Sequence, residues 1–229
     1  MIRCMSVNLI SISKPEIKGV KNAEDLVAYC ARVSNPNNQL NTQTAPKLLK
    51  YLIKHKHWSP FEMVSMTLEI KTSRAIAAQI LRHRSFSFQE FSQRYSESLS
   101  SIPTELRKQG KTNRQVGDEV IDPVIMDEFY SETTRPASEI IKDYINFTFK
   151  IYERLIKQGV ARESARMILP LSTETTMYMS GSLRSWIHYI DLRTQQETQK
   201  EHREIAEGCK QIFLDKFPTL AEALKWNNS

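Results

Sequence analysis

The densest group of residues able to bind an anion lies between positions 82 and 96. Arg82, His83 and Arg84 follow one another directly, and further arginine, serine and aromatic residues follow them. Arginine presents a planar fork of N–H donors that pairs with phosphate, and serine hydroxyls or loop amides can complete such a site. Aromatic rings supply stacking surface for a planar heterocycle, and this segment carries Phe86, Phe88, Phe91 and Tyr95. The segment therefore contains the group types needed to hold a phosphorylated heterocycle.

The same residue types also occur in two quite different settings. Cations at the end of a helix interact favourably with its dipole, and most of them are solvated surface charges. A site for single-stranded nucleic acid would also combine arginines on phosphates with aromatic rings on bases. The net charge of +6 and the pI near 9.2 suit nucleic acid and phosphorylated small molecules alike. The rest of the chain must therefore separate these possibilities.

The run from Arg82 to Arg94 resembles the signature of the flavin-dependent thymidylate synthases, which is written RHRxxS and extended as RHRxxSxNExSxR. A motif of this kind is a hypothesis until its context agrees with it. Seven positions match the pattern, namely Arg82, His83, Arg84, Ser87, Glu90, Ser92 and Arg94.

Three further segments resemble elements of the same family, in the family's order and with similar spacing. They are an upstream H-x-(S/T)-P-F-E segment, a central ARxxLP element and two downstream arginine positions that contact flavin and dUMP. A basic nucleic-acid-binding module does not account for this ordered set. The matching residues are His57, Ser59, Phe61, Glu62, Arg166, Leu169, Pro170, Ser182, Arg184, Leu192 and Arg193.

The resemblance implies a role for each matched residue. Arg193 is expected to be catalytic, because the matching arginine of the family lies against the uracil ring and favours ionisation at N3. The residues implied for flavin binding are His57, Ser59, Arg82, His83, Arg84, Ser85, Glu90, Ser182, Arg184 and His188. The residues implied for dUMP binding are Gln79, Arg82, Glu90, Phe91, Ser92, Gln93, Arg94, Arg166 and Arg193.

The resemblance also implies the reaction and its participants. The expected reaction is the FAD-dependent reductive methylation of dUMP to dTMP, with methylene-tetrahydrofolate as carbon donor, NADPH as reductant and tetrahydrofolate as product. Members of the family are homotetramers whose active sites lie between subunits. We therefore expect dUMP, folate and NADPH as partners, and neither nucleic acid nor a membrane.

Four polar positions depart from the family pattern. Gln89 and Ser182 stand where the family usually has Asn, His188 where Asn is common, and Glu197 where some members have His. Glutamine, serine and histidine keep donor and acceptor capacity, whereas an ionised glutamate only accepts. The departures bear on flavin affinity and folate placement. They leave open a relative that keeps the fold without the activity.

Neither cysteine nor metal chemistry is indicated. Cys4, Cys30 and Cys209 are scattered and form no CxxC spacing, so each is expected to be a buried small hydrophobe. His55 and His57 are two residues apart, which opposes them on a helix, and no third ligand has suitable spacing. We therefore predict no metal site and no cysteine nucleophile, in agreement with a reaction whose hard chemistry is carried by a cofactor.

Length and composition are those of a globular protein. The 229 residues are 40% hydrophobic and 25% charged, with 6 Gly and 9 Pro, which suits a single domain over residues 1–229. No run reaches the roughly 18 apolar residues that span a bilayer. The N-terminus does not have the pattern of a signal peptide. The expected location is the cytoplasm.

Hydrophobic periodicity predicts intermixed helices and strands without regular βαβ alternation. On the strand expected at 63–71, Val64, Met66, Leu68 and Ile70 share one face. No GxGxxG or Walker loop is present. We predict an α+β fold, a mostly antiparallel sheet flanked by helices as in the resembled family, with a surface excursion over about 99–124. Strands are expected at 1–12, 63–71 and 171–180, and helices at 22–33 (capped by Asn22), 44–55, 74–82 (capped by Ser73), 123–158 (stopped by Gly159), 162–170, 182–192, 198–217 and from Pro218.

Overall fold

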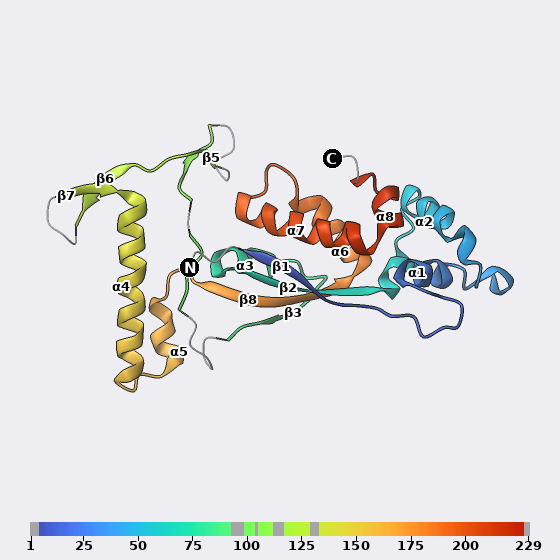
Figure 1. Cartoon of the computed structure of the whole chain (residues 1–229), viewed down its shortest axis with the longest axis horizontal. Helices are drawn as coiled ribbons and strands as arrows, with labels where there is room; N and C mark the ends of the chain where they lie inside the picture. Colours follow the sequence, from blue (N-terminus) through green and yellow to red (C-terminus); the bar gives the residue numbers. More distant parts are fainter. Residues whose placement is uncertain (1–4, 93–98, 104, 112–116, 129–132, 227–229) are drawn as a thin grey trace.

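A four-stranded antiparallel sheet, in the order β1-β2-β8-β3, forms the centre of the molecule (Figure 1). The computed structural model describes residues 5–92, 99–103, 105–111, 117–128 and 133–226. Each neighbouring pair of strands in this sheet is antiparallel, so the predicted α+β class with a mostly antiparallel sheet is confirmed. The four strands are β1 (Ser6–Ile12), β2 (Ser65–Ser73), β8 (Glu174–Ser182) and β3 (Ser87–Glu90).

One face of the sheet is buried in the core. The predicted inward residues Val64, Met66, Leu68 and Ile70 are all buried, which confirms the alternation expected from the sequence. Polar side chains of the opposite face bond across the strands, such as the Tyr178 hydroxyl to the Glu69 carboxylate at 3.3 Å. The site residues must therefore be carried by the helices and by the strand ends.

Helices cover the buried face of the sheet (Figure 1). The predicted caps are confirmed, because the Asn22 side chain accepts from the Asp25 N–H at 2.8 Å and the Ser73 side chain accepts from the Ile76 N–H at 3.4 Å. Trp186 is fully buried beneath them and donates from its indole to the Met66 carbonyl at 2.9 Å. The helices that contact the sheet are α3 (Arg74–Ile80), α6 (Leu183–Arg193) and α7 (Lys200–Lys216). The helices α1 (Ala23–Ala31), α2 (Ala45–Lys54) and α8 (Pro218–Ala223) extend this layer at one end, with the 3-10 turns η1 (Pro36–Asn38), η2 (Thr42–Thr44) and η3 (Ser59–Met63).

A second group of elements stands at the end of the sheet opposite α2 (Figure 1). The helix expected at 123–158 is wrong in its first part, where β6 (Val124–Asp127) and β7 (Thr133–Pro136) pair as a two-stranded ribbon. Pro136 cannot lie inside a helix, and it forms the N-terminal cap position of α4 (Ala137–Lys157). The helix expected at 162–170 divides into α5 (Arg162–Ala165) and η4 (Arg166–Ile168).

Other strands also differ from the expected ones, and the strand expected at 63–71 is β2 at Ser65–Ser73. β3 has no counterpart among the expected strands, because its four residues are too few to show alternation. β8 begins at Glu174 rather than at residue 171, since the N–H of Thr173 turns back to the Pro170 carbonyl at 2.9 Å. The excursion at 99–124 contains a ribbon of β4 (Arg107–Gln109) and β5 (Gly117–Val120), and Ser101 bridges to Thr173. In the part of the chain that is described, no helix is long and apolar enough to cross a membrane.

The end of α2 predicts a stabilising substitution. Lys56 lies in the left-handed region at φ 56°. Its N–H donates to the Ile53 carbonyl at 3.1 Å, and the N–H of His57 donates to the Leu52 carbonyl at 2.8 Å, which together form a Schellman motif. A side chain in this region costs about 1 kcal/mol relative to glycine. Lys56→Gly should therefore raise the free energy of unfolding by about that amount in urea titrations. The matched control is Gly159→Ala at the same position of α4 (φ 83°), which should lower it; no change in either variant would contradict the assignment.

Candidate active site

Backbone turns hold the segment that follows α3. The N–H of His83 bonds to the Ile80 carbonyl at 3.0 Å, and the N–H of Phe86 bonds to the His83 carbonyl at 3.2 Å. These turns leave the His83 ring half-buried, whereas Arg82 and Arg84 are exposed. Neither arginine forms an ion pair with a described residue, so two guanidinium groups face solvent at the end of α3.

Phe86 anchors this segment to the core. Its ring is buried, and the ring centroids of Trp186 and Tyr189 lie 4.8 and 6.0 Å away, both in edge-to-face geometry. The ring also lies against Gly181 of β8, where any side chain would collide with it. Phe86 therefore fixes how the preceding Arg82–Ser85 stretch sits on the sheet.

Arg193 at the end of α6 pairs with His83. Its Nε donates to Nε2 of His83 at 2.9 Å, so the proton of the neutral imidazole must be on Nδ1. Burial lowers the pKa of His83 to about 4, and the charges of Arg193 and His188 add to this effect. The guanidinium is thus held in place by a neutral ring, and the predicted residues His83 and Arg193 do meet.

Behind this pair lies a buried histidine that belongs to none of the sequence motifs. Nε2 of His202 is 3.2 Å from the hydroxyl of Tyr189, and its Nδ1 is 3.3 Å from Oε1 of Gln79. The ring centroid of His83 is 4.9 Å from that of Tyr189 and 6.2 Å from that of His202. The sequence does indicate that His202 is buried, because this histidine lies on the apolar stripe of α7 that continues through Ile205, Ala206, Cys209 and Phe213.

The two histidines predict how stability depends on pH. Burial, with the charges of Arg193 and His83, lowers the pKa of His202 to about 4, below its unfolded value near 6.5. The unfolded chain therefore binds protons first, so stability is complete above pH 6.5 and is lost as the pH falls towards 4. His202 alone should cost about 2 kcal/mol of unfolding free energy between pH 7 and 5, and half-buried His83 less.

Urea titrations of the wild type and of His202→Asn at these two pH values check the prediction. The variant should lose clearly less stability than the wild type between pH 7 and 5, where carboxylates titrate little. An equal loss in both proteins would show that His202 is not a neutral buried residue.

A cavity of about 770 Å³ is lined by Ser85 and Asp191, which lie within two residues of His83 and Arg193, but neither His83 nor Arg193 lines it. Arg184, His188 and Asp191 face it from α6, because residues four and three apart share one side of a helix. Ser85 also lines it, and Ser185 donates to the Ser85 carbonyl at 3.2 Å. Apolar side chains also line the cavity, namely those of Ile53, Trp58, Ile187, Leu224 and Trp226.

Glu62 organises the mouth of the cavity. Its carboxylate accepts from Arg184 at 2.9 Å and from the hydroxyl of Ser182, which is the N-cap of α6. The structure thus brings together three of the expected flavin residues around the cavity, Ser85, Arg184 and His188, and joins Ser182 to them through Glu62. His57 and Ser59 flank Trp58 but are exposed and do not line the cavity.

The remaining expected residues lie elsewhere in the chain. Glu90, at the end of β3, accepts from Thr175 at 2.9 Å, and the N–H of Phe91 bonds to the Thr176 carbonyl at 2.8 Å. Ser92 follows them and is half-buried. Gln93 and Arg94 lie outside the described residues.

Arg166 is separated from the cavity by the length of β8. It precedes this strand, whereas Arg184 follows it, and nine residues of strand span roughly 26 Å. Its Nε is buried and has no hydrogen-bond partner in the described structure. A buried guanidinium nitrogen without a partner is costly, which favours an anion at this place. In the described residues, no group of three or more His, Cys, Asp or Glu is placed to hold a metal ion.

Comparisons with known proteins show the family of the chain. The family model described as thymidylate synthase complementing protein matches residues 17–219. A probable flavin-dependent thymidylate synthase of Paramecium bursaria Chlorella virus 1 is 53% identical over 97% of this chain and 100% of the viral protein. A flavin-dependent thymidylate synthase of Synechocystis sp. is 49% identical, over 97% of this chain and 100% of its own length. The chain therefore belongs to the flavin-dependent thymidylate synthase family, a family of enzymes.

A solved structure adds a likeness in three dimensions. The UMP/dUMP methylase PolB from Streptomyces cacaoi, bound with 5-Br dUMP, has a TM-score of 0.75 and 26% identity to this chain. The match covers 97% of this chain and 95% of PolB. The fold predicted from the family resemblance is thereby confirmed.

Proposed function

We propose that the protein methylates dUMP to dTMP, with FAD as cofactor, methylene-tetrahydrofolate as carbon donor and NADPH as reductant, and that it releases tetrahydrofolate. The proposal rests on two observations, the Arg193–His83 pair and a cavity of about 770 Å³ whose polar lining includes Ser85, Arg184 and His188. Membership of the family supports the reaction type.

The cavity fits a flavin in size and in chemistry. Its volume lies within the range of sites that enclose small ligands and cofactors. The rings of Trp58 and Trp226 offer flat apolar surface to a planar ring system, and Arg184 and Lys225 offer positive charge to phosphates. FAD held there would, once reduced by NADPH, supply the hydride that completes the new methyl group.

The chain's own contribution to the chemistry is the placement of Arg193. Arginine has five N–H donors, and His83 takes one of them, which leaves the terminal nitrogens for a ligand. Because His83 is neutral, it places no second positive charge next to the Arg193 guanidinium. A fixed guanidinium against the uracil would stabilise negative charge as it develops at N3, and this kind of preorganised donor is worth roughly 3 kcal/mol.

For dUMP we propose Gln79, Arg82, Glu90, Phe91, Ser92, Gln93, Arg94, Arg166 and Arg193 as binding residues. The unpartnered Nε of Arg166 suits a phosphate oxygen. One chain holds Arg166 and Arg184 at opposite ends of β8, so a site that uses both needs more than one subunit. We place His57, Ser59, Arg82, His83, Arg84, Ser85, Glu90, Ser182, Arg184 and His188 around FAD in such a shared site.

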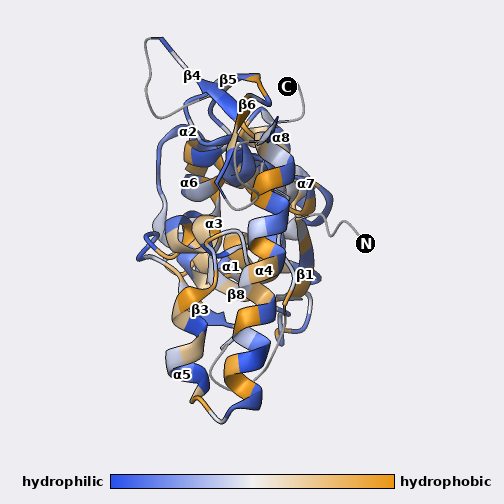
Figure 2. Ribbon diagram, turned by 90° about the vertical axis from the view of Figure 1, so that its left-hand side faces the viewer, coloured by the Kyte–Doolittle hydropathy of each residue, from blue (hydrophilic) through white to orange (hydrophobic). Residues whose placement is uncertain are grey.

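Exposed apolar residues near α4 support assembly into a homotetramer. Val124 and Met126 of β6 are 65% and 60% exposed, and Met167 and Leu171 beside α5 are 78% and 70% exposed. In Figure 2, α4 and α5 face the viewer with hydrophobic segments along their surfaces. Large exposed apolar areas of this kind are typical of protein interfaces. Subunits that meet here would bring Arg166 to the site of a neighbour.

The proposal predicts that the cysteines are dispensable. Cys209 is fully buried in α7, and burial raises the pKa of its thiol, as it does for the half-buried Cys30. Cys4 lies outside the described residues. Replacing all three with alanine should leave kcat within about threefold of the wild type, because a buried protonated thiol is no nucleophile. Complete loss of turnover in a triple variant with a wild-type circular dichroism spectrum would contradict this.

The reaction itself tests the proposal. Formation of dTMP from dUMP should require FAD, methylene-tetrahydrofolate and a reduced nicotinamide together, and the folate product should be tetrahydrofolate. Rescue of thymidine-requiring cells by the wild-type chain should accompany it. A protein that binds flavin and dUMP but forms no dTMP with all components present would be the inactive relative.

A further inference from the structure

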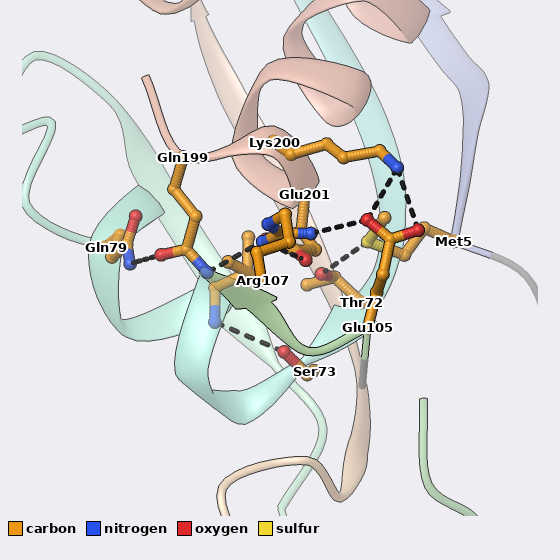
Figure 3. A network of polar contacts seen from close by, with 10 residues as sticks. Met5, Thr72, Ser73, Gln79, Glu105, Arg107, Gln199, Lys200 and Glu201 are labelled. Atoms are coloured by element: carbon orange, nitrogen blue, oxygen red, sulfur yellow. Dashed lines mark hydrogen bonds and ion pairs between the residues drawn. The ribbon is translucent and has the colours of Figure 1, made fainter. Parts of the chain in front are cut away.

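A chain of polar side chains runs from the β4–β5 ribbon to the centre of the site. Nη2 of Arg107, on β4, lies 2.7 and 2.9 Å from the two carboxylate oxygens of Glu201. Gln199 donates from Nε2 to Glu201 at 2.9 Å, and Gln79 donates from Nε2 to Oε1 of Gln199 at 2.7 Å (Figure 3). His202 continues the chain, with Nδ1 3.3 Å from Oε1 of Gln79.

The Glu201 carboxylate determines which group donates and which accepts along this chain of side chains. An ionised carboxylate only accepts, so Gln199 must turn Nε2 towards Glu201 and Oε1 towards Gln79. Gln79 then offers Oε1 to His202, which carries its proton on Nδ1 and accepts from the Tyr189 hydroxyl at Nε2. One orientation of the Gln79 amide satisfies every member of this chain.

The protonation states agree with this order. Burial raises the pKa of Glu201, but the hydrogen bonds from Arg107 and Gln199 outweigh it, so the net pKa is below the usual value. His202 is neutral at pH 7, as its lowered pKa requires. A protonated His202 would have a donor at both nitrogens and would lose the hydrogen bond from Tyr189.

Arg107 belongs to the excursion whose function the sequence leaves open. Its side chain is 13% exposed, and both it and Lys200 bind Glu105, at 2.9 and 2.8 Å. These contacts hold β4 against the start of α7 (Figure 3). The next residue on the strand, Lys108, has a side chain that is 65% exposed and lies 3.8 Å from Glu119 within the ribbon.

We infer that Arg107, Glu201, Gln199 and His202 are positioning residues that hold the Gln79 amide in one orientation for recognition of the nucleotide. The inference rests on the proposed role of Gln79 in dUMP binding. Gln79 keeps one N–H of Nε2 and one lone pair of Oε1 for a ligand. A preordered amide binds more tightly than a mobile one, because the ordering cost is already met within the protein. The β4–β5 ribbon is then a structural part of the substrate site.

Two substitutions of His202 separate its two hydrogen bonds. Asparagine places an amide near the position of Nδ1 and can donate to Gln79, whereas glutamine reaches the position of Nε2 and can accept from Tyr189. For the FAD-loaded enzyme, His202→Asn should keep the KM for dUMP within about twofold, and His202→Gln should raise it about tenfold with a smaller change in kcat. Equal KM values in the two variants would overturn the inference.

A double-mutant cycle tests the connection from the ribbon. Arg107→Gln should weaken dUMP binding about tenfold in isothermal titration, whereas Lys108→Gln should leave the Kd unchanged. In a Gln79→Ala background, Arg107→Gln should have little further effect, because residues that act through one group are not additive. Full additivity would contradict the inference. If the Arg107 variant does not fold, the pair of His202 variants decides.

The wild type separates this inference from the proposed function. A wild-type protein that does not bind dUMP when loaded with FAD would remove the proposed function, and the inference with it. A wild type that binds dUMP, with His202→Gln and Arg107→Gln binding equally well, would overturn the inference and leave the proposed function intact.

Discussion

Replacing Arg193 with alanine is expected to lower kcat by about 10²- to 10³-fold, the largest effect of any single substitution in the site. Its guanidinium is the group we place against the uracil, and loss of one preorganised donor to a developing anion has this magnitude. The KM for dUMP should change less than kcat, because an interaction made mainly in the transition state acts on the chemical step. Steady-state kinetics with saturating FAD and folate measure both quantities.

A second readout of Arg193→Ala concerns His83. Without the neighbouring positive charge, the pKa of His83 should rise from about 4, and this shift can be followed by NMR of the imidazole resonances. The matched control is Arg203→Ala on α7, whose guanidinium donates to the Gln196 carbonyl at 3.1 Å and which should leave kcat unchanged. A kcat within threefold of the wild type for Arg193→Ala would contradict the catalytic role.

Gly181→Ala is expected to lower the free energy of unfolding by about 2–3 kcal/mol and to reduce activity. A methyl group on residue 181 would lie 2.7 Å from Cε1 of Phe86 and closer still to Cδ1, well within van der Waals contact. The Phe86 ring cannot move freely, because Trp186 and Tyr189 enclose it. The collision must therefore displace the Arg82–Ser85 stretch, which carries residues of the site. Urea titration and kcat/KM for dUMP measure the two effects.

A compensating substitution tests that mechanism. Phe86→Leu removes the ring atoms that would collide, so the double variant Gly181→Ala with Phe86→Leu should be more stable than the sum of the two single effects predicts. The coupling should amount to about 1 kcal/mol or more. Additive effects of the two substitutions would show that the glycine is not required by this close approach.

The centre of the site could be predicted where its residues are contiguous in sequence. The run Arg82, His83, Arg84 carries its own signature, and Arg193 follows from a second short motif. The structure brings His83 and Arg193 together, and joins Ser85, Arg184 and His188 around one cavity. α3 and α6 begin at opposite ends of the antiparallel β2–β8 pair, and the hydrogen bond between His83 and Arg193 joins the far ends of the two helices.

The polar chain behind the site could not be predicted in the same way. Arg107 and Glu201 are 94 residues apart, and Gln79 and Gln199 are 120 apart, so no local pattern connects them. His202 lies on an apolar helix face, where a histidine is usually a packed residue rather than a functional one. The role of His202 depends on its hydrogen bonds with Tyr189 and Gln79, which are brought to it by tertiary packing.

Secondary structure was predicted best where periodicity is long and worst near proline and short strands. The strand expected at 63–71 is observed as β2 two residues further on, and its inward residues Met66, Leu68 and Ile70 are buried as expected, because the alternation is long and clear. The helix expected from residue 123 begins only at Ala137, because Pro136 removes a backbone donor and cannot be accommodated inside a helix. β3 has four residues and is stabilised by its pairing with β8 rather than by its own sequence.

The most direct test of the proposed function follows the flavin under anaerobic conditions. Purified protein is loaded with FAD, NADPH is added with and without dUMP, and the visible flavin absorbance is recorded. We predict bleaching that requires the protein and whose rate dUMP alters. A protein that retains no flavin, or whose flavin NADPH cannot reduce under either condition, would contradict the proposed function and would favour single-strand nucleic-acid binding by the exposed arginines.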